Sequence, residues 1–252
     1  MQKTIFVTGA ASGIGKETAL LFGKRGYRVG CYDVDVEGAA KVASQIESAS
    51  HGRLDVTSEE SWKTAVADFG SSSSERLDVL FNCAGILRMG RFEDVAPAEC
   101  RKQLEVNVMG VVIGIQTCLP MLERSRGAIV NMSSASAIYG QPELAVYSAT
   151  KFAVRALTEA LDIELRSKGV RIADVMPGYV DTPMVSSQTH RATSLKKMGV
   201  KLRPEGIAEI VWTAAHGTKL HHIPQADLRL MQRVGGLVPE LGRAVMRRIA
   251  SR

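Results

Sequence analysis

The segment KTIFVTGAASGIG, residues 3–15, decides the fold of this chain. Its first half is a short run of apolar and β-branched residues, which is typical of a buried β-strand. Three glycines follow, Gly9, Gly13 and Gly15, and the next segment has the length and amphipathic pattern of a helix. Glycines at such a turn let a pyrophosphate approach the positive end of a helix closely. The segment therefore predicts a strand, turn and helix that bind a dinucleotide.

The same alternation of apolar strands and helix-length segments continues along the chain. Strands are expected at residues 3–9, 27–33, 52–56, 77–85, 127–134 and 170–178. Helices are expected at residues 13–24, 36–46, 59–69 and 99–121, and from about residue 147 onward. Strands that alternate with helices form a parallel sheet covered on both faces. We therefore expect an α/β fold, a doubly wound parallel sheet in a single domain over residues 1–252, with ligands bound beyond the carboxyl ends of the strands.

Composition and charge narrow the functional classes. The chain has 252 residues, 45% of them hydrophobic, which suits one globular domain with a sizeable core. The four cysteines form no C-x-x-C pair, so we expect reduced thiols and no metal site. Residues 219–252 carry +5 of the net charge of +6, which argues against a basic surface for nucleic acid. We recognise no leader peptide and no apolar stretch of membrane-spanning length, and therefore expect a cytoplasmic protein.

An acidic residue, Asp33, ends the second strand eighteen residues after Gly15. Its carboxylate would accept hydrogen bonds from the adenosine ribose hydroxyls and would repel a 2′-phosphate. No lysine or arginine lies between Gly9 and Gly15 or closely follows Asp33, so we expect NAD rather than NADP. Asp55 is placed to reach the adenine amino group, and Val56 to pack on the adenine ring. Three residues that end the fourth strand are expected beside the cofactor: Asn82, Ala84 and Gly85.

Tyr147 and Lys151 are four residues apart, which on a helix places both side chains on one face. The spacing is also common by chance, so other motifs have to support it. A tyrosine hydroxyl has a pKa of about 10, and a nearby positive charge favours the phenolate and lowers that pKa. Lowering it toward 7 requires roughly 4 kcal/mol, which one ammonium in water does not supply. A partly desolvated pocket is therefore expected around this pair.

Several motifs occur in a fixed order: TGAASGIG at residues 8–15, NCAG at 82–85, Asn107, Ser134, YSATK at 147–151 and PGYVDT at 177–182. In these motifs, within residues 3–215, the chain resembles the short-chain dehydrogenase/reductase family. The resemblance implies a Rossmann-fold oxidoreductase with a catalytic tetrad: Asn107, Ser134, Tyr147 and Lys151. The tyrosine would be the general acid/base on the substrate oxygen, and the serine would hold that oxygen. The lysine would lower the tyrosine's pKa, aided by the charge of oxidised nicotinamide, and bind the nicotinamide ribose.

The resemblance also implies how the cofactor is held. The backbone carbonyl of Asn107 would hold a water that extends a proton path from the lysine, and Thr182 would hold the nicotinamide carboxamide. The cofactor is expected to contact Gly9, Ser12, Gly13, Ile14, Gly15, Asp33, Asp55, Val56, Asn82, Ala84, Gly85, Tyr147, Lys151, Pro177, Gly178, Val180 and Thr182. A homodimer through the helices that bear Asn107 and Tyr147, or a homotetramer, follows from the family pattern.

Two segments depart from the regular alternation. Residues 179–203 have neither a helical nor a strand period and follow a strand end, so we expect a substrate-binding loop, with a plain surface excursion as the alternative. Residues 226–252 form a basic, helical C-terminal extension with an apolar stripe of Leu241, Val245 and Ile249. The extension resembles that of family members that act on steroids, retinoids and other lipophilic alcohols. We expect it to close the substrate cleft; a dimer contact, attachment to an anionic membrane surface and simple packing on its own domain are the alternatives.

The sequence therefore predicts an NAD(H)-dependent oxidoreductase that interconverts a secondary alcohol and its ketone on a small, lipophilic substrate. A catalytically silent NAD-binding regulator is the alternative, against which the intact tetrad argues. A nucleotide-sugar epimerase fits less well, because such chains are longer and have a different glycine spacing.

Overall fold

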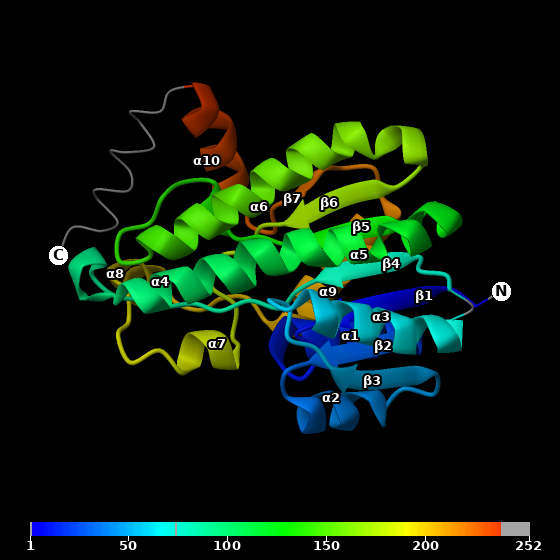
Figure 1. The fold of residues 1–252 in the computed structure, drawn as a ribbon. Coiled ribbons are helices and arrows are strands. Elements are labelled where there is room, and N and C mark those ends of the chain that lie inside the picture. Colours follow the sequence, from blue (N-terminus) through cyan, green and yellow to red (C-terminus); the bar gives the residue numbers. More distant parts are fainter. Residues whose placement is uncertain (1, 74, 238–252) are drawn as a thin grey trace.

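The chain folds around a seven-stranded parallel sheet, shown in Figure 1. The computed structural model describes residues 2–73 and 75–237. The strands lie in the order β3-β2-β1-β4-β5-β6-β7. Their bounds are β1 Thr4–Thr8, β2 Arg28–Asp33, β3 Ala49–Arg53, β4 Val79–Asn82, β5 Ala128–Met132, β6 Arg171–Val175 and β7 His221–His222. The predicted doubly wound parallel sheet is confirmed, and β7 adds a short strand that the sequence pattern does not indicate.

Helices cover both faces of the sheet. Their bounds are α1 Gly13–Lys24, α2 Val36–Ala43, α3 Glu59–Ser73, α4 Pro97–Leu104, α5 Gly110–Ser125, α6 Ala145–Glu164, α7 Pro183–Ser186, α8 Thr193–Met198, α9 Pro204–His216 and α10 Ala226–Leu237. Helices α1, α2 and α9 pack on one face, and α3, α5 and α6 on the other. The short helices α7 and α8 lie beyond the carboxyl ends of the strands, at the left of Figure 1.

Strand residues alternate between two hydrophobic cores. In β1, Ile5 and Val7 pack with α1, α2 and α9, whereas Phe6 packs with α3 and α5. All five residues of β1 are buried, because a sheet covered on both faces accepts a continuous apolar sequence. The Phe6 ring stacks on Tyr32 with a centroid distance of 4.4 Å and lies 5.7 Å from Trp62. These contacts fix β1 at the centre of the sheet and so position the glycine turn at its end.

Two element boundaries differ from the sequence-based expectation. The third strand is Ala49–Arg53 rather than residues 52–56, and it forms one edge of the sheet. Its position is set by pairing with residues 29–33 of β2, because its own sequence offers few apolar residues to bury. Asp55 and Val56 therefore follow the strand instead of ending it. Residues 71–73, part of a serine run that is typical of a loop, form the last turn of α3.

The helix expected at residues 99–121 runs from Pro97 to Ser125 and contains a π-helical turn, η2 Glu105–Met109, between α4 and α5. By length and composition this 29-residue helix could cross a membrane, with a mean hydropathy of 1.5 over its most apolar window. The expectation that no stretch reaches this length is therefore wrong. Within the domain, 44% of that window is buried, and Ile113 and Cys118 belong to the core around α3 and α5. A core helix passes the same test, so this helix is weak evidence for a membrane protein.

The C-terminal extension is described as far as Leu237. In α10, Leu228 packs on Ala135 and Ala137, which form the 3-10 turn η3 Ala135–Ala137. None of residues 226–233, the part of this helix whose side chains the structure describes, lines the cavity that contains the candidate site. This part of the extension therefore does not close the substrate cleft as expected. It packs behind the site instead. The predicted apolar stripe of Leu241, Val245 and Ile249 lies outside the described residues.

Candidate active site

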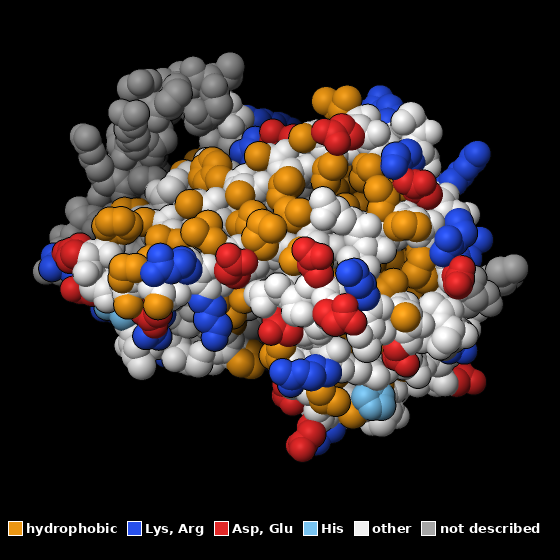
Figure 2. All heavy atoms as spheres, viewed as in Figure 1, with side chains coloured by type: hydrophobic (Ala, Val, Ile, Leu, Met, Phe, Trp, Pro, Cys, Tyr) orange, Lys and Arg blue, Asp and Glu red, His pale blue; other side chains and the backbone are white. Residues whose placement is uncertain are grey.

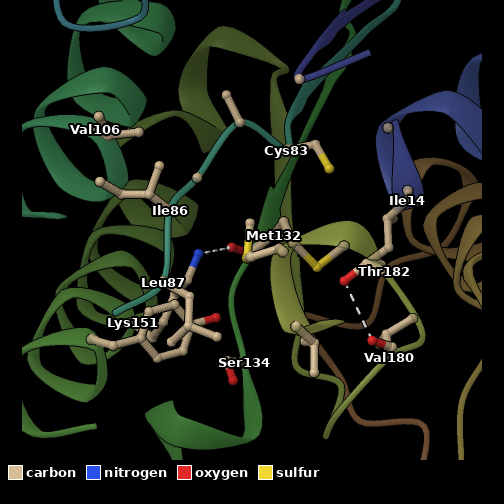
Figure 3. A pocket seen from close by; sticks show the side chains of 18 of the residues that line it. Ile14, Cys83, Ile86, Leu87, Val106, Met132, Ser134, Lys151, Val180 and Thr182 are labelled. Carbon is tan, nitrogen blue, oxygen red and sulfur yellow. Dashed lines mark hydrogen bonds between the residues drawn. The ribbon is translucent and has the colours of Figure 1, made fainter. Parts of the chain in front are cut away.

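A cavity of about 960 Å³ opens at the carboxyl ends of the strands. Its walls contain every predicted cofactor and catalytic residue except Asn82 and Asn107. Figure 3 shows Cys83 and Ile86, from the segment after β4, on one part of the wall, with Ile14 of α1 and Thr182 on another. The topology brings these segments together, because parallel strands point their carboxyl ends to the same edge of the sheet.

The glycine turn after β1 packs tightly against the segment after β4. A Cβ atom on Gly9, whose φ is +69°, would lie 2.9 Å from the Ala84 Cα, and one on Gly15 would lie 2.0 Å from the Gly9 carbonyl oxygen. The Thr8 hydroxyl accepts a hydrogen bond from the Ala84 amide across 3.0 Å. Ser12 makes no side-chain cap on α1, so the first amides of this helix keep their capacity to bind an anion. The turn is therefore built to bring backbone close to a phosphate.

Asp33 lies at the end of β2 beside this turn. One carboxylate oxygen accepts a hydrogen bond from the Ala11 amide and the other from the Asp35 amide, both at 3.0 Å. Each oxygen keeps capacity for a further donor, as ribose recognition requires. Arg53, an exposed residue of β3, is paired in register with Asp33. This basic neighbour was missed in the sequence, where it lies twenty residues away, and it weakens the argument that no cation accompanies Asp33.

Asp55 and Val56 line the same end of the cavity as Asp33. The Asp55 Oδ1 atom accepts hydrogen bonds from the Thr57 hydroxyl at 2.7 Å and from the Thr57 amide at 3.0 Å, and these bonds lower the pKa of Asp55. The Trp62 indole nitrogen donates to the carbonyl oxygen of Val56 across 3.1 Å. Both residues are thus fixed by the turn between β3 and α3 rather than by the sheet.

Asn82 does not lie where the sequence reasoning placed it. It is 3% exposed, and its Nδ2 atom donates to Asn131 Oδ1 of the neighbouring strand across 2.9 Å. Asn131 in turn donates to the Thr158 hydroxyl of α6 across 3.0 Å. Because its side chain is used to join β4 to β5 inside the sheet, Asn82 is a buried structural residue and not part of the cavity wall.

Asn107 lies behind the cavity wall, within the π-helical turn. Its Oδ1 atom accepts the Ile86 amide at 2.8 Å, and its Nδ2 atom donates to the Ile86 carbonyl at 2.9 Å and to the Thr150 hydroxyl at 3.1 Å. The side chain therefore joins the segment after β4 to helix α6, beside Lys151. A π-turn leaves backbone groups out of the usual helical pattern and is frequent at functional sites. Asn107 positions the wall that contains the lysine.

Ser134, Tyr147 and Lys151 meet on one wall of the cavity. Ser134 follows β5, whereas Tyr147 and Lys151 lie in the first two turns of α6. Lys151 is 5% exposed, and its Nζ atom donates to the carbonyl oxygen of Met132 across 2.8 Å, as Figure 3 shows. The same atom lies 5.6 Å from the centroid of the Tyr147 ring. The predicted helical spacing thus places the ammonium and the phenol side by side.

Burial governs how this pair titrates. Burial raises the pKa of Tyr147 to about 12, although its interaction with the Ser134 hydroxyl opposes the rise. Burial also lowers the pKa of Lys151 to about 8. The expected lowering of the tyrosine's pKa is therefore not present in the chain alone, because desolvation of the phenolate outweighs its neighbours. A further positive charge in the cavity would lower the pKa of Tyr147.

The remaining part of the cavity is mainly apolar. The residues that give it this character are Ile86, Leu87, Leu144, Met184, Val185 and Met198. Three of them belong to residues 179–203, so this irregular segment lines the ligand site. Its Gln188 donates to the Leu87 carbonyl at 3.0 Å and accepts the Met89 amide at 3.2 Å. Those bonds join the segment to the opposite wall; Met89, which is buried, does not itself line the cavity.

Several lining residues were missed in the sequence, and four of them can bear on the chemistry of the site. Tyr139 and Gln141 lie between Ser134 and Tyr147, and Tyr179 directly follows Gly178. Their position between or beside motif residues is the signal that could have identified them. Cys83 also lines the cavity, and burial raises the pKa of its thiol to about 12, so it stays protonated at neutral pH.

His221 and His222 are away from the cavity. His221 lies between two carboxylates, with Nδ1 2.9 Å from Asp174 Oδ1 and Nε2 3.2 Å from Glu159 Oε1. Asp174 is fully buried in β6. Among residues 2–73 and 75–237, no group of three histidine, cysteine or acidic side chains is arranged to hold a metal ion. These contacts make His221 a structural residue.

The arrangement fits an elongated nicotinamide dinucleotide. The lining includes Asp33 at the end of β2, the N-terminus of α1 with Thr182 beside it, and Lys151 of α6. Thr182 caps the start of α7, and its hydroxyl donates to the Val180 carbonyl across 3.4 Å. A Cβ atom on Gly13 would lie 3.1 Å from the Thr182 methyl carbon, so α1 and the segment before α7 converge over the middle of the cavity.

Known proteins resemble this chain over most of its length. A family model described as short chain dehydrogenase matches residues 3–193. A 3-alpha-(or 20-beta)-hydroxysteroid dehydrogenase from Mycobacterium tuberculosis is 40% identical over 184 residues, which cover 72% of this chain and 70% of the relative. A cyclohexanol dehydrogenase from Acinetobacter sp. is 34% identical over 216 residues, which cover 83% of this chain and 86% of the relative.

Solved structures agree with this result. A 3-ketoacyl-(acyl-carrier-protein) reductase from Brucella melitensis, complexed with NADH, has a TM-score of 0.80 and 30% identity, covering 88% of this chain and 96% of that one. An alcohol dehydrogenase from Thermococcus sibiricus, complexed with 5-hydroxy-NADP, has a TM-score of 0.79 and 25% identity over the same shares. Together with the parallel sheet, the glycine turn and the serine, tyrosine and lysine on one cavity wall, these likenesses show that the chain belongs to the short-chain dehydrogenase/reductase family of Rossmann-fold oxidoreductases.

Proposed function

We propose that this protein is an NAD(H)-dependent dehydrogenase that interconverts a secondary alcohol and its ketone on a small, lipophilic substrate. The observation that carries the proposal is the meeting of Ser134, Tyr147 and Lys151 on the wall of a cavity whose other part is lined by apolar side chains. The names of the hydroxysteroid and cyclohexanol dehydrogenases support a ring alcohol as substrate.

The chain's own residues would move the proton and exclude water. A bound nicotinamide cofactor supplies the hydride acceptor or donor. Tyr147 would take the proton of the substrate hydroxyl in oxidation and return it in reduction, while the Ser134 hydroxyl donates a hydrogen bond to the same oxygen. Lys151, held by the Met132 carbonyl, would add positive charge beside the phenol and bind the nicotinamide ribose. Leu87, Met184 and the other apolar side chains would keep water from the reacting carbon.

The preference for NAD is part of the proposal. Asp33 supports it, because its carboxylate lies at the end of β2 with one oxygen bonded to the Ala11 amide of the glycine turn and the other to the Asp35 amide. A 2′-phosphate placed beside this carboxylate would be repelled. Arg53 is the residue that would oppose this preference, since it is the register partner of Asp33 in β3.

A homodimer and a cytoplasmic location complete the proposal. Helices α4 to α6 present exposed apolar side chains on one face, among them Leu104 at 44%, Met109 at 42% and Phe152 at 40% exposure. Figure 2 shows hydrophobic side chains gathered over these helices. An apolar face of this kind is what a second copy of the chain would cover.

The experiment that tests the proposed reaction is absorbance at the reduced-nicotinamide band. NAD or NADP would be supplied with secondary alcohols that range from short aliphatics to ring alcohols and steroids. Turnover with NAD on an apolar alcohol, reduced about 10²- to 10⁴-fold in Tyr147→Phe, is the expected result. No turnover across the range, with NAD binding intact by calorimetry, would favour the cofactor-binding regulator instead.

A further inference from the structure

The apolar part of the cavity contains one polar corner, formed by Tyr139, Gln141, Tyr179 and Ser194. Gln141 is 6% exposed and lines the cavity together with the two tyrosines, whereas Ser194 is buried behind them in α8. The backbone amide of Gln141 donates to the Ser148 hydroxyl across 3.1 Å, which ties this corner to the first turn of α6, next to Tyr147. The corner thus adjoins the catalytic wall.

The oxygen end of the Gln141 amide is already used. Oε1 lies 3.0 Å from the Tyr179 hydroxyl and 3.4 Å from the Ser194 hydroxyl, and it accepts a hydrogen bond from one of them. The other hydroxyl donates to the first across 2.8 Å, because each hydroxyl has one proton to give. A primary amide has one acceptor end and one donor end, so fixing the oxygen toward α8 turns the NH₂ group to the opposite side.

The donor end is left without a strong partner. Among the hydrogen bonds of the described residues, none uses Gln141 Nε2, and this atom is not one of the buried side-chain atoms that lack a partner. The Gln141 Nε2 atom is thus unpaired but not sealed from solvent. Because Gln141 lines the cavity, a ligand in the cavity can reach this atom. An NH₂ group has two N–H donors, and the neighbouring Tyr139 oxygen can take one of them, so at least one N–H of Gln141 is left to bind a ligand in the cavity.

Tyr139 supplies a second unsatisfied group at the same place. Its hydroxyl is buried, and among the described residues it makes no well-formed hydrogen bond. Burial raises the pKa of Tyr139, while the nearby Gln141 amide opposes that rise, which places the amide and the hydroxyl close together. Because this hydroxyl is sealed from solvent, it lies behind the Gln141 amide and supports it, while other atoms of Tyr139 line the cavity.

From this orientation we infer that the Gln141 NH₂ group, positioned by Tyr139, binds a second oxygen on the substrate, away from the carbon that is oxidised. The inference rests on the proposed dehydrogenase function and narrows its substrate to ring alcohols or ketones with an additional carbonyl or hydroxyl oxygen. A site that hydrogen-bonds a substrate oxygen rejects analogues without it, because its own polar groups then stay unpaired. Purely apolar alcohols are accordingly the poorer substrates.

The test compares pairs of substrates that differ only in the second oxygen. Two sets are used, in which this oxygen lies near to or far from the reacting carbon. The near set is cyclohexanol against the cyclohexanediols and hydroxycyclohexanones, and the far set is 5α-androstan-3α-ol against androsterone. The ratio of kcat/KM for each pair would be measured in the wild type, in Tyr139→Phe and in Gln141→Leu. We expect a wild-type preference of at least tenfold for one oxygenated compound, and a loss of about tenfold of that preference in each variant.

Two controls separate recognition from structure. Gln141→Glu keeps an oxygen for Tyr179 and Ser194 but removes the NH₂ donor, so it should lose the preference as Gln141→Leu does. Thermal unfolding of each variant shows whether the domain is intact. The inference would be overturned if kcat/KM fell equally for both compounds of a pair in the variants. It would also be overturned if the wild type showed no preference between the two compounds. A preference for hydroxyl compounds alone would also overturn it, because an N–H donor binds a carbonyl oxygen as well as a hydroxyl oxygen.

Failure of the proposed reaction is distinguishable from failure of this inference. If the wild type oxidises none of these alcohols, the dissociation constants of cyclohexanol and of the favoured oxygenated compound are measured by calorimetry with NAD present. Tighter binding of the oxygenated compound, lost in Tyr139→Phe, would retain the polar corner as a binding site without catalysis. Equal binding of both compounds would reject the inference itself.

Discussion

The Nζ atom of Lys151 donates to the carbonyl oxygen of Met132 across 2.8 Å, in surroundings that lower the pKa of this lysine to about 8. The ordinary value is 10.5. The folded protein therefore releases this proton at lower pH than the unfolded chain does. Between pH 8 and 10.5 the unfolded state binds more protons, so this group makes folding stability rise with pH.

Replacement of Lys151 by methionine should reveal this pH dependence. We expect the free energy of unfolding of the wild type, relative to Lys151→Met, to increase as the pH rises from 8 to 10, by at most about 1.4 kcal/mol per pH unit. Urea unfolding of both proteins at several pH values measures the difference. A difference that is constant with pH would mean that Lys151 keeps its ordinary pKa despite its burial.

Asp33 and Arg53 should together decide the choice of cofactor. In Asp33→Ser, loss of the carboxylate removes the repulsion of a 2′-phosphate, so the ratio of NAD to NADP affinity should fall at least tenfold. Arg53 would supply the compensating charge, and Asp33→Ser/Arg53→Ala should then bind NADP more weakly than Asp33→Ser alone. Dissociation constants from calorimetry test both steps. If Asp33→Ser leaves the ratio unchanged, another residue selects the cofactor.

The exposed apolar face of α4 to α6 should mediate self-association. Phe152→Glu places a charge within this face and should convert a dimer to a monomer. Light scattering coupled to size exclusion measures the mass. Val36→Glu, at 36% exposure in α2 on the opposite face of the sheet, is the control for added charge. A wild-type monomer at micromolar concentration would rule out the proposed dimer.

Removal of His221 should destabilise the domain by leaving Asp174 unpaired. Asp174 is fully buried, its Oδ2 atom has no partner among the described residues, and burial raises its pKa. We expect His221→Leu to cost roughly 3 kcal/mol at pH 7, as for other buried pairs that lose one member. Protonation of the carboxylate relieves the unpaired charge, so the cost should be smaller at pH 5.

Asp174→Asn in the same background provides the control. The double variant should recover much of the stability that His221→Leu loses, because no buried charge then lacks a partner. Urea unfolding of the wild type, both single variants and the double variant gives the coupling free energy. Strictly additive effects would show that the two side chains do not stabilise each other.

Glu143 should control how firmly the segment around α8 closes the cavity. Its carboxylate accepts the Thr193 amide at 2.6 Å and contacts His190 Nε2 at 2.8 Å, while its own carbonyl accepts the Gly90 amide at 2.9 Å. Glu143→Ala removes the two contacts to the segment, and we expect KM for substrate to rise about tenfold with less than a threefold change in kcat. Glu143→Gln can still accept the hydrogen bond of the Thr193 amide, so its KM should lie between those of the wild type and Glu143→Ala. An equal fall in kcat for both variants would contradict this role.

The parts of the site that depend on spacing within one element could be predicted from the sequence. Tyr147 and Lys151 share the first turns of α6, and the glycines of residues 9–15 share one turn, so their relative placement follows from local geometry. Asp33 is similar, because the end of a central strand fixes its position at the edge of the sheet. The family resemblance added the serine, whose distance from the tyrosine crosses a loop.

What could not be predicted depends on contacts between distant segments. Asn82 carries a motif position, yet its partner is Asn131 on the adjacent strand, 49 residues away. Gln141 acquires its orientation from Tyr179 and Ser194, 38 and 53 residues further along. The pKa of Tyr147 in the chain alone depends in the same way on packing, because burial of the phenol raises it, whereas the expected lowering includes the charge of bound oxidised nicotinamide.

The central position of β1 also has a consequence for biosynthesis. β1 pairs with β2, but its other neighbour is β4, and the Thr4 amide and hydroxyl meet the Asp78 carboxylate 74 residues later in the chain. During synthesis, both edges of β1 are therefore covered only after four of the seven strands have emerged from the ribosome. Contacts of such long sequence separation slow folding. Emergence of β4, rather than completion of the first βαβ unit, is then the point at which the central strand no longer offers an open edge to other chains.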